Sequence, residues 1–232
     1  MAKIFIIIPT YNEKNNISQL LEKIFTQKIS GLNVLVVDDN SPDKTGRLVE
    51  ELKQKYFDLD ILHRQEKSGL GKAYIAGFKL ALENGADYIF EMDADLSHDP
   101  KYLPDFLKKI ESCDLVLGSR YIKDGGVSNW NLARRLVSRF GNIYARIVLN
   151  LPYHDLTGGF KCYRRQVLEN IGLDDLSSVG YNFQIETTYK AHKKGYKIEE
   201  TPIIFCERAE GKSKFSIKII LESFWKVLLL RF

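Results

Sequence analysis

The segment Ile89-Phe90-Glu91-Met92-Asp93-Ala94-Asp95-Leu96-Ser97-His98 passes from a largely apolar run into a polar turn that holds two carboxylates. A short apolar run that ends in a turn is typical of a strand buried on both faces. Such strands form parallel sheets covered by helices, and the ligands of these sheets bind beyond the carboxyl ends of the strands. We therefore expect Asp93 and Asp95 to lie at the binding edge of a parallel sheet.

Comparable runs, brief and rich in β-branched residues, alternate with stretches whose apolar residues follow the helical period. The sequence predicts an α/β fold, in which a mostly parallel, Rossmann-like sheet is flanked by helices. After Leu117 this rhythm changes to a glycine-containing loop and a helical pattern. The expected strands are 4–8, 34–37, 59–62, 88–92 and 115–117, and the expected helices include 17–25, 73–81 and about 131–150.

The composition excludes several classes of protein. A chain of 232 residues with 44% hydrophobic content can bury a core, and a net charge of +4, with basic and acidic residues interspersed, argues against a nucleic-acid partner. Cys113, Cys162 and Cys206 form no paired spacing, so we expect reduced thiols. The first apolar run is too short for a signal peptide and is interrupted by Pro9. We expect a cytoplasmic protein.

Asp93 and Asp95 are candidate metal ligands. In extended backbone, residues two apart face the same side, and two neighbouring carboxylates repel each other unless a cation neutralises them. Oxygen ligands suit Mg²⁺ or Mn²⁺, which often bridge to substrate phosphates. A turn in which Asp95 or Asp99 caps the helix after Pro100 is the alternative interpretation.

Two further strand ends carry polar residues. The first, Pro9-Thr10-Tyr11-Asn12-Glu13, offers an aromatic ring and a carboxylate to a base, and the second, Val37-Asp38-Asp39-Asn40-Ser41-Pro42-Asp43, offers Asp39 to ribose or base donors. Helix capping and turn formation explain either segment when it is taken alone. Turn formation alone does not explain why several strands end in carboxylates at the same edge of the sheet.

Glycines and basic residues mark the remaining candidates. Gly69-Leu70-Gly71-Lys72 opens a helix without a known phosphate-loop spacing, and we interpret it as tight backbone beside a nucleotide. Asp155-Leu156-Thr157-Gly158-Gly159-Phe160-Lys161 suits backbone that a ligand approaches closely, or a simple turn. Arginines give forked donors to phosphate oxygens, although solvated helix charge explains each of them singly. Three basic clusters favour a second anionic ligand: Gly118-Ser119-Arg120-Tyr121, Arg134-Arg135-x-x-Ser138-Arg139 and Arg208-x-x-Gly211-Lys212-Ser213-Lys214.

The segment 215–232 predicts an amphipathic helix with a narrow polar stripe. Trp225 and the flanking lysines suit a membrane interface, and packing on the sheet or on a membrane partner explains the pattern equally well.

Together and in order, these motifs resemble glycosyltransferase family 2, and within it the polyprenyl-phosphate (dolichol-phosphate) mannose synthases. The resemblance covers nearly the whole chain. It implies a GT-A fold with a catalytic domain at 1–214, of which about 1–118 binds the nucleotide and about 119–214 the acceptor, followed by the helix 215–232. It also implies inverting, metal-dependent transfer of mannose from GDP-mannose to polyprenyl or dolichyl phosphate, with Mg²⁺ or Mn²⁺, by an enzyme peripheral on the cytoplasmic face of a membrane or held by a small membrane subunit.

The resemblance also assigns residues. Those it places on the nucleotide sugar are Pro9, Tyr11, Glu13, Val37, Asp39, Asp93, Ala94, Asp95, Arg208 and Lys214. Asp93 and Asp95 would hold the metal, Arg120, Arg134 and Ser138 would receive the lipid phosphate, and Asp93, Asp95 and Arg120 would be catalytic. Ser97 stands where some relatives have glutamine, so a metal contact there stays open. Transfer of glucose from a UDP-sugar and a nucleotide-binding membrane scaffold remain alternative functions.

Overall fold

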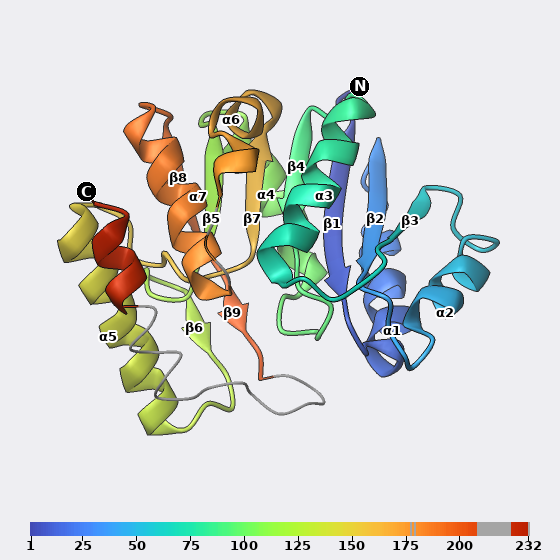
Figure 1. Ribbon diagram of the computed structural model, residues 1–232, viewed down its shortest axis with the longest axis horizontal. Coiled ribbons are helices and arrows are strands. Elements are labelled where there is room, and N and C mark those ends of the chain that lie inside the picture. Colours follow the sequence, from blue (N-terminus) through green and yellow to red (C-terminus); the bar gives the residue numbers. More distant parts are fainter. Residues whose placement is uncertain (177, 179, 208–223, 232) are drawn as a thin grey trace.

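A mixed sheet of seven strands forms the centre of the computed structural model, which describes residues 1–176, 178, 180–207 and 224–231 (Figure 1). The strand order is β3-β2-β1-β4-β7-β5-β8, and β7 alone of these strands runs antiparallel to its neighbours. The strands are β1 (Ile4–Thr10), β2 (Leu32–Asp38), β3 (Leu59–His63), β4 (Tyr88–Glu91), β5 (Leu115–Ser119), β7 (Lys161–Arg164) and β8 (Ile198–Pro202). A separate parallel pair is formed by β6 (Gly126–Val127) and β9 (Ile204–Phe205).

Helices cover both faces of the sheet, because successive strand residues enter opposite cores. Ile7 packs in one cluster with Phe78 of α3, whereas Ile6 and Ile8 pack in the other with Leu20 of α1. The helices are α1 (Lys14–Phe25), α2 (Thr45–Leu52), α3 (Leu70–Glu83), α4 (Leu103–Ile110), α5 (Leu132–Leu149), α6 (Arg165–Asn170) and α7 (Tyr181–Lys193), with short 3₁₀ turns at Pro100–Tyr102 and Leu173–Asp175. This arrangement confirms the α/β class expected from the sequence.

The strand register brings the polar strand ends to one edge. Thr10 at the end of β1 pairs with Asp38 at the end of β2, and Ile7 of β1 pairs with Glu91 at the end of β4. The three strands are parallel, so the residues that follow each of them leave the sheet on the same side. The expectation of several acid-tipped strands at one edge is confirmed.

Residues 224–231 lie against α5, at the side of the molecule away from β3 (Figure 1). The Tyr144 hydroxyl donates a hydrogen bond to the carbonyl oxygen of Phe224 (3.0 Å), and Arg231 donates to the carbonyl oxygen of Val148 (2.9 Å). Residues 224–229 are helical, in agreement with that part of the expected terminal helix, and 215–223 lie outside the described residues. In the part of the chain that the structure describes, no helix is long and apolar enough to cross a membrane.

Candidate active site

The two adjacent aspartates after β2 have different environments. Asp38 accepts hydrogen bonds from the Thr10 hydroxyl (2.9 Å) and from both the amide and the hydroxyl of Ser41 (3.0 and 2.6 Å). It therefore stabilises the turn, as the turn interpretation predicts. Asp39 instead accepts from Nη1 of Arg64 at 2.6 Å, with 6% of its side chain exposed.

Burial is the main influence on Asp39, and it raises the pKa of this carboxyl against the opposing effect of the Arg64 guanidinium. Arg64, just after β3, was not identified from the sequence because an isolated arginine after a strand carries no motif. The pair keeps one carboxylate at the edge of the sheet where a nucleotide would bind.

The segment after β1 forms the neighbouring part of this edge. Pro9 is paired in register with Val37, and the Nζ atom of Lys67 lies 3.6 Å from the centre of the Tyr11 ring. The carboxylate of Glu13 accepts from the Asn16 side chain (2.8 Å), and the Glu13 amide donates to the hydroxyl of Thr45. The structure thus gathers the predicted nucleotide residues of β1 and β2 at one place, with Tyr11 and Glu13 partly exposed.

Asp93 and Asp95 lie beyond the end of β4, and Asp95 lies in a bend at 94–96. The strand ends at Glu91, and Leu96 adopts a left-handed conformation with φ 63°. The expectation that an extended strand aligns the two side chains is therefore wrong, because the strand ends two residues before Asp93 and a bend begins at Ala94. The Asp93 amide donates to Nδ1 of His98 (3.2 Å), and the Ser97 amide donates to Oδ1 of Asp95 (3.1 Å).

The capping interpretation is correct for Asp99 and not for Asp95. Asp99 is the N-cap of the 3₁₀ turn Pro100–Tyr102, since its Oδ1 atom accepts from the Lys101 amide at 3.1 Å. Asp95 stabilises its own bend through Ser97. Helix capping therefore accounts for Asp99 but not for Asp93, whose Oδ1 atom accepts from the Tyr74 hydroxyl at 3.0 Å.

The glycine pair Gly158-Gly159 lies between the carboxylate bend and a basic cluster. A Cβ atom on Gly159 would lie 3.4 Å from Oδ2 of Asp93, and one on Gly158 would lie 3.6 Å from Oδ1 of Asp155. Asp155 is the ion-pair partner of Arg120. One peptide unit, about 3.8 Å between Cα atoms, therefore joins the two groups of side chains.

The residues of the bend fit a hard divalent cation. Asp93 and Asp95 supply carboxylate oxygens, and the buried Ser97 hydroxyl oxygen has no hydrogen-bond partner among the described residues. Within those residues, no group of three or more histidine, cysteine and acidic side chains could hold a metal by itself. A cation here would share its coordination with oxygens from a ligand, as Mg²⁺ commonly does with phosphates.

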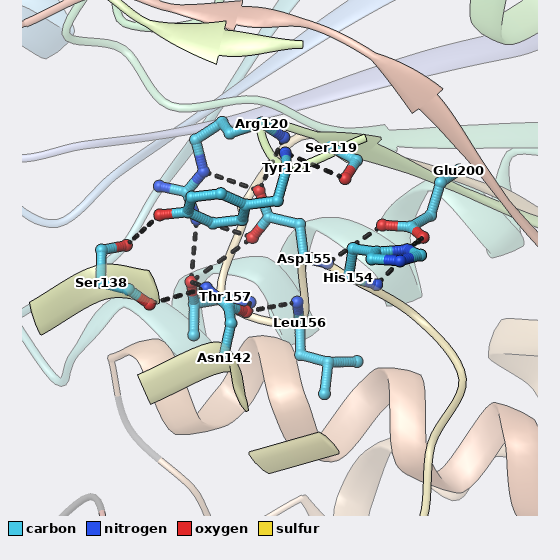
Figure 2. Close-up of polar contacts among 10 residues, drawn as sticks. All are labelled: Ser119, Arg120, Tyr121, Ser138, Asn142, His154, Asp155, Leu156, Thr157 and Glu200. Carbon is cyan, nitrogen blue, oxygen red and sulfur yellow. Dashed lines mark hydrogen bonds and ion pairs between the residues drawn. The ribbon is translucent and has the colours of Figure 1, made fainter. Parts of the chain in front are cut away.

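The expected acceptor residue Arg120 is buried and held by Asp155 (Figure 2). Its Nε and Nη2 atoms donate to the two carboxylate oxygens of Asp155, both at 2.7 Å, and Nη2 also donates to the hydroxyl of Thr157 at 2.8 Å. This planar, bidentate arrangement fixes the direction of the guanidinium group. The sequence indicated a close approach of ligand to this backbone, or a turn, and did not predict this role for Asp155 and Thr157.

The remaining acceptor residues lie around the same group. The guanidinium carbons of Arg120 and Arg134 lie 5.6 and 4.1 Å from the centre of the Trp130 ring. The Ser138 hydroxyl accepts from the Tyr121 hydroxyl at 2.7 Å. Arg120, Arg134 and Ser138 are thus brought together through Trp130 and Tyr121. Arg208 and Lys214 lie outside the described residues.

The glycine at the start of α3 has a packing role. A Cβ atom on Gly71 would lie 2.8 Å from the Phe183 ring, so this position is constrained by α7. Gly69, with φ 101°, begins the helix as expected. Close approach of a nucleotide is not needed to explain Gly71.

Comparison with known proteins gives consistent matches. The family described as Glycosyl transferase family 2 matches residues 5–172. The chain is 43% identical to a polyprenol monophosphomannose synthase of Mycolicibacterium smegmatis, covering 96% of this chain and 84% of that protein. It is 42% identical to an undecaprenyl-phosphate mannosyltransferase of Micrococcus luteus, covering 95% and 90% of the two chains.

Solved structures agree in fold. Glucosyl-3-phosphoglycerate synthase from Mycobacterium tuberculosis, in complex with Mn²⁺, UDP and glucosyl-3-phosphoglycerate, matches with a TM-score of 0.69 at 16% identity, covering 99% of this chain and 78% of that one. TarS 1–349 of S. aureus, in complex with UDP-GlcNAc, matches with a TM-score of 0.68 at 21% identity, covering 98% of this chain and 66% of that one. These likenesses confirm the GT-A fold.

Proposed function

The chain belongs to glycosyltransferase family 2, and we propose that it transfers mannose from GDP-mannose to a polyprenyl phosphate such as dolichyl phosphate, with inversion at the anomeric carbon. The two relatives above are named for mannose transfer to such lipids, and they match this chain over most of their length. The site geometry supports a reaction between two phosphate-bearing molecules.

One observation carries the proposal. Asp93 borders Gly159, whereas Asp155, the ion-pair partner of Arg120, borders the adjacent Gly158. Asp93 and Asp95 would bind a sugar diphosphate through a divalent metal, whereas Arg120, Arg134 and Ser138 would bind a phosphate directly. A donor diphosphate on one side and an acceptor phosphate on the other leave the sugar between them.

The donor side would use the remaining predicted residues. Tyr11 offers a ring to the base, and Asp39 offers acceptor oxygens to base or ribose donors. Pro9, Glu13, Val37 and Ala94 would line the same part of the site, and Arg208 and Lys214 would bind the donor phosphates. Residues about 1–118 would form the nucleotide part and about 119–214 the acceptor part.

The chemistry demands little proton transfer. A phosphate acceptor is anionic at neutral pH, so its oxygen can attack the anomeric carbon without a general base while the bond to the diphosphate breaks. The bound Mg²⁺ or Mn²⁺ would supply Lewis-acid neutralisation of the departing diphosphate. Asp93 and Asp95 would hold that cation, and Arg120 would orient the attacking oxygen.

The surface of α5 supports a position on a membrane, as a polyprenyl substrate requires. Five exposed apolar residues recur at helical spacing along its outer face, flanked by the exposed Arg135 and Arg139. We name this stripe the outer face of α5: Leu132, Leu136, Phe140, Ile143 and Ile147. Trp225, which is 64% exposed, lies on the adjoining terminal segment.

Apolar residues flanked by arginines are suited to an anionic lipid surface. We infer from this surface that the protein is a peripheral enzyme on the cytoplasmic face of a membrane. A small membrane subunit could occupy the same face.

The experiment that tests the function compares donors on one acceptor. Release of nucleotide from GDP-mannose and from UDP-glucose is measured with polyprenyl phosphate and Mg²⁺ or Mn²⁺, and the product is analysed for a β-linked mannosyl phosphate. We expect turnover with GDP-mannose that depends on both lipid and metal. Preferential turnover of UDP-glucose, or an α-linked product, would contradict the proposal.

A further inference from the structure

We propose that Asp155 and Thr157 are positioning residues that fix Arg120 for the acceptor phosphate, and that Asn142 ties them to the α5 residues that bind the same phosphate. The proposal rests on the function proposed above. It starts from the fact that the phosphate-binding residues come from separate elements: Arg120 follows β5, whereas Arg134 and Ser138 lie on α5.

Asp155 binds Arg120 at both its main chain and its side chain (Figure 2). Its Oδ2 atom accepts from the Arg120 amide at 2.9 Å and from Nε at 2.7 Å, and its Oδ1 atom accepts from Nη2 at 2.7 Å. A carboxylate that binds both ends of one arginine restrains the rotamers between them. The side chain of Asp155 is fully buried and that of Arg120 is 6% exposed, so solvent competes little with this pair.

Thr157 connects this pair to α5. Its Oγ1 atom accepts from Nη2 of Arg120 at 2.8 Å and from Nδ2 of Asn142 at 3.0 Å. A hydroxyl oxygen has two lone pairs, so both are used. The position of Thr157 therefore depends on Arg120 and Asn142 together.

Asn142 lies one helical turn after Ser138, on the inner face of α5. Its Oδ1 atom accepts from the amides of Leu156 (2.7 Å) and Thr157 (3.3 Å), and Nδ2 also donates to the carbonyl oxygen of Ser138 at 3.0 Å. Figure 2 shows the resulting chain of contacts from Ser138 through Asn142 and Thr157 to Arg120.

The loop that carries Asp155 is also held from β8. The Glu200 carboxylate accepts from the amides of His154 and Asp155, each at 3.0 Å, and from the His154 ring at 2.8 Å. The loop is thus fixed on both sides, which is the condition for an exact orientation of Arg120.

Asp155 could act on Arg120 through its negative charge or by orienting the guanidinium group. These two roles predict different effects on acceptor binding and turnover, so kinetics can distinguish them. Asp155 neutralises Arg120, so replacing it with asparagine strengthens the attraction of the guanidinium for any phosphate while it loosens the geometry. We expect Asp155→Asn to lower kcat about 10- to 100-fold without raising the KM for polyprenyl phosphate. The KM for GDP-mannose should stay unchanged.

The experiment measures kcat and both KM values for Asp155→Asn, with thermal unfolding as the check on folding. Asp174→Asn is the matched control, because Asp174 also pairs with a basic residue, Lys79, but is exposed and lies outside the site. An unchanged kcat in the folded Asp155 variant, or a raised acceptor KM at constant kcat, would overturn the proposal.

A second pair of variants covers the case in which Asp155→Asn does not fold. Thr157→Val removes both hydrogen bonds at nearly constant shape, and Thr157→Ser keeps them. We expect Thr157→Val to lower kcat and Thr157→Ser to keep kcat close to that of the wild type. Equal kcat in these two variants would contradict the role of Thr157. Wild-type protein that transfers no mannose to polyprenyl phosphate would instead refute the proposed function, and this inference with it.

Discussion

The Tyr74 hydroxyl of α3 donates a hydrogen bond to Oδ1 of Asp93 across 3.0 Å. Tyr74 is fully buried, and burial together with the Asp93 charge raises its pKa well above the ordinary value. The phenol therefore stays protonated and remains a donor at neutral pH. One oxygen of Asp93 is oriented in this way toward the protein.

The first prediction concerns this contact. Tyr74→Phe removes the hydroxyl that orients a proposed metal ligand, and changes of this kind typically weaken metal affinity by about 10- to 100-fold. We expect weaker Mn²⁺ binding by that factor, measured by calorimetry and by the Mn²⁺ dependence of turnover. Tyr196→Phe is the control, because the Tyr196 hydroxyl donates to the Gln166 carbonyl oxygen away from the site. Equal Mn²⁺ affinity in both variants would refute the role of Tyr74.

The second prediction tests Asp95 itself. Asp95→Ala removes a proposed metal ligand, and loss of several kcal/mol of transition-state stabilisation corresponds to a decrease in kcat of at least about 10²-fold. The protein should remain folded, because the hydrogen bond that Asp95 accepts from Ser97 is local and is worth only about 1 kcal/mol. Asp99→Ala loses a similar bond to the Lys101 amide and should retain turnover. Full activity of a folded Asp95→Ala protein would contradict the assignment.

The third prediction uses the raised pKa of Asp39. Protonation removes the negative charge that pairs with Arg64 and would accept donors of the nucleotide, so the KM for GDP-mannose should rise as pH falls from neutral toward this pKa. The effect of Asp39 on the stability of the folded state should have the opposite dependence on pH. The folded state holds this proton more tightly than the unfolded state, so the contribution of Asp39 to stability falls as pH rises through the window between the two pKa values.

In the Asp39→Asn variant, the KM for GDP-mannose should no longer rise as pH falls. Initial rates at several pH values, for wild type and variant, provide the measurement. The same pH profile in both proteins would show that another group titrates.

The fourth prediction concerns Lys161, which is fully buried and donates to the Gln184 carbonyl oxygen and to the hydroxyls of Thr187 and Thr188. Burial lowers its pKa from 10.5 to about 8. Between these values the unfolded state binds more protons than the folded state, so this group makes stability rise with pH across that window.

Lys161→Met should remove this rise, while the other titrating groups remain. Urea unfolding of both proteins at neutral and alkaline pH measures the difference between them. A difference in the free energy of unfolding that does not change with pH would contradict the lowered pKa.

The fifth prediction concerns the outer face of α5. Phe140 is 61% exposed, and Phe140→Asp places a negative charge in the apolar stripe, so vesicles that contain anionic lipid should bind the variant at least about tenfold more weakly. Phe57→Asp is the control, because Phe57 is 96% exposed just before β3, at the other end of the sheet. Flotation measures the bound fraction, and equal flotation of both variants would show that α5 does not contact the bilayer.

Much of the fold was predictable because short buried strands leave a clear pattern. The runs at β1, β2, β4 and β5 are largely buried, and β3 keeps an apolar core in Leu59, Ile61 and Leu62. All five strands were located within three residues at each end. The antiparallel β7 was not, because Lys161-Cys162-Tyr163-Arg164 is polar in sequence and is buried through contacts with Glu91 and α7. Such contacts depend on partners far away in the chain.

The parts of the candidate site that could be predicted from the sequence are its charged residues, because a charge at the end of a buried strand indicates a ligand. Asp39, Asp93 and the arginines carry charges that a strand end does not need. The supporting residues were missed because asparagine, threonine and tyrosine are common in turns and helices. Asn142 has no local signal, and its importance follows only from hydrogen bonds to residues 14 and 15 positions away.

Helix α5 has its outer apolar stripe on one side and Ser138 and Asn142 on the other, and an α-helix is about 10–12 Å across. A lipid phosphate would therefore have to rise above the bilayer surface by little more than the width of one helix to reach Arg120. The hydrocarbon tail could stay among its neighbours throughout the reaction. On this geometry, we expect the enzyme to distinguish acceptors by their headgroup and to leave the number of isoprene units to the membrane that supplies them.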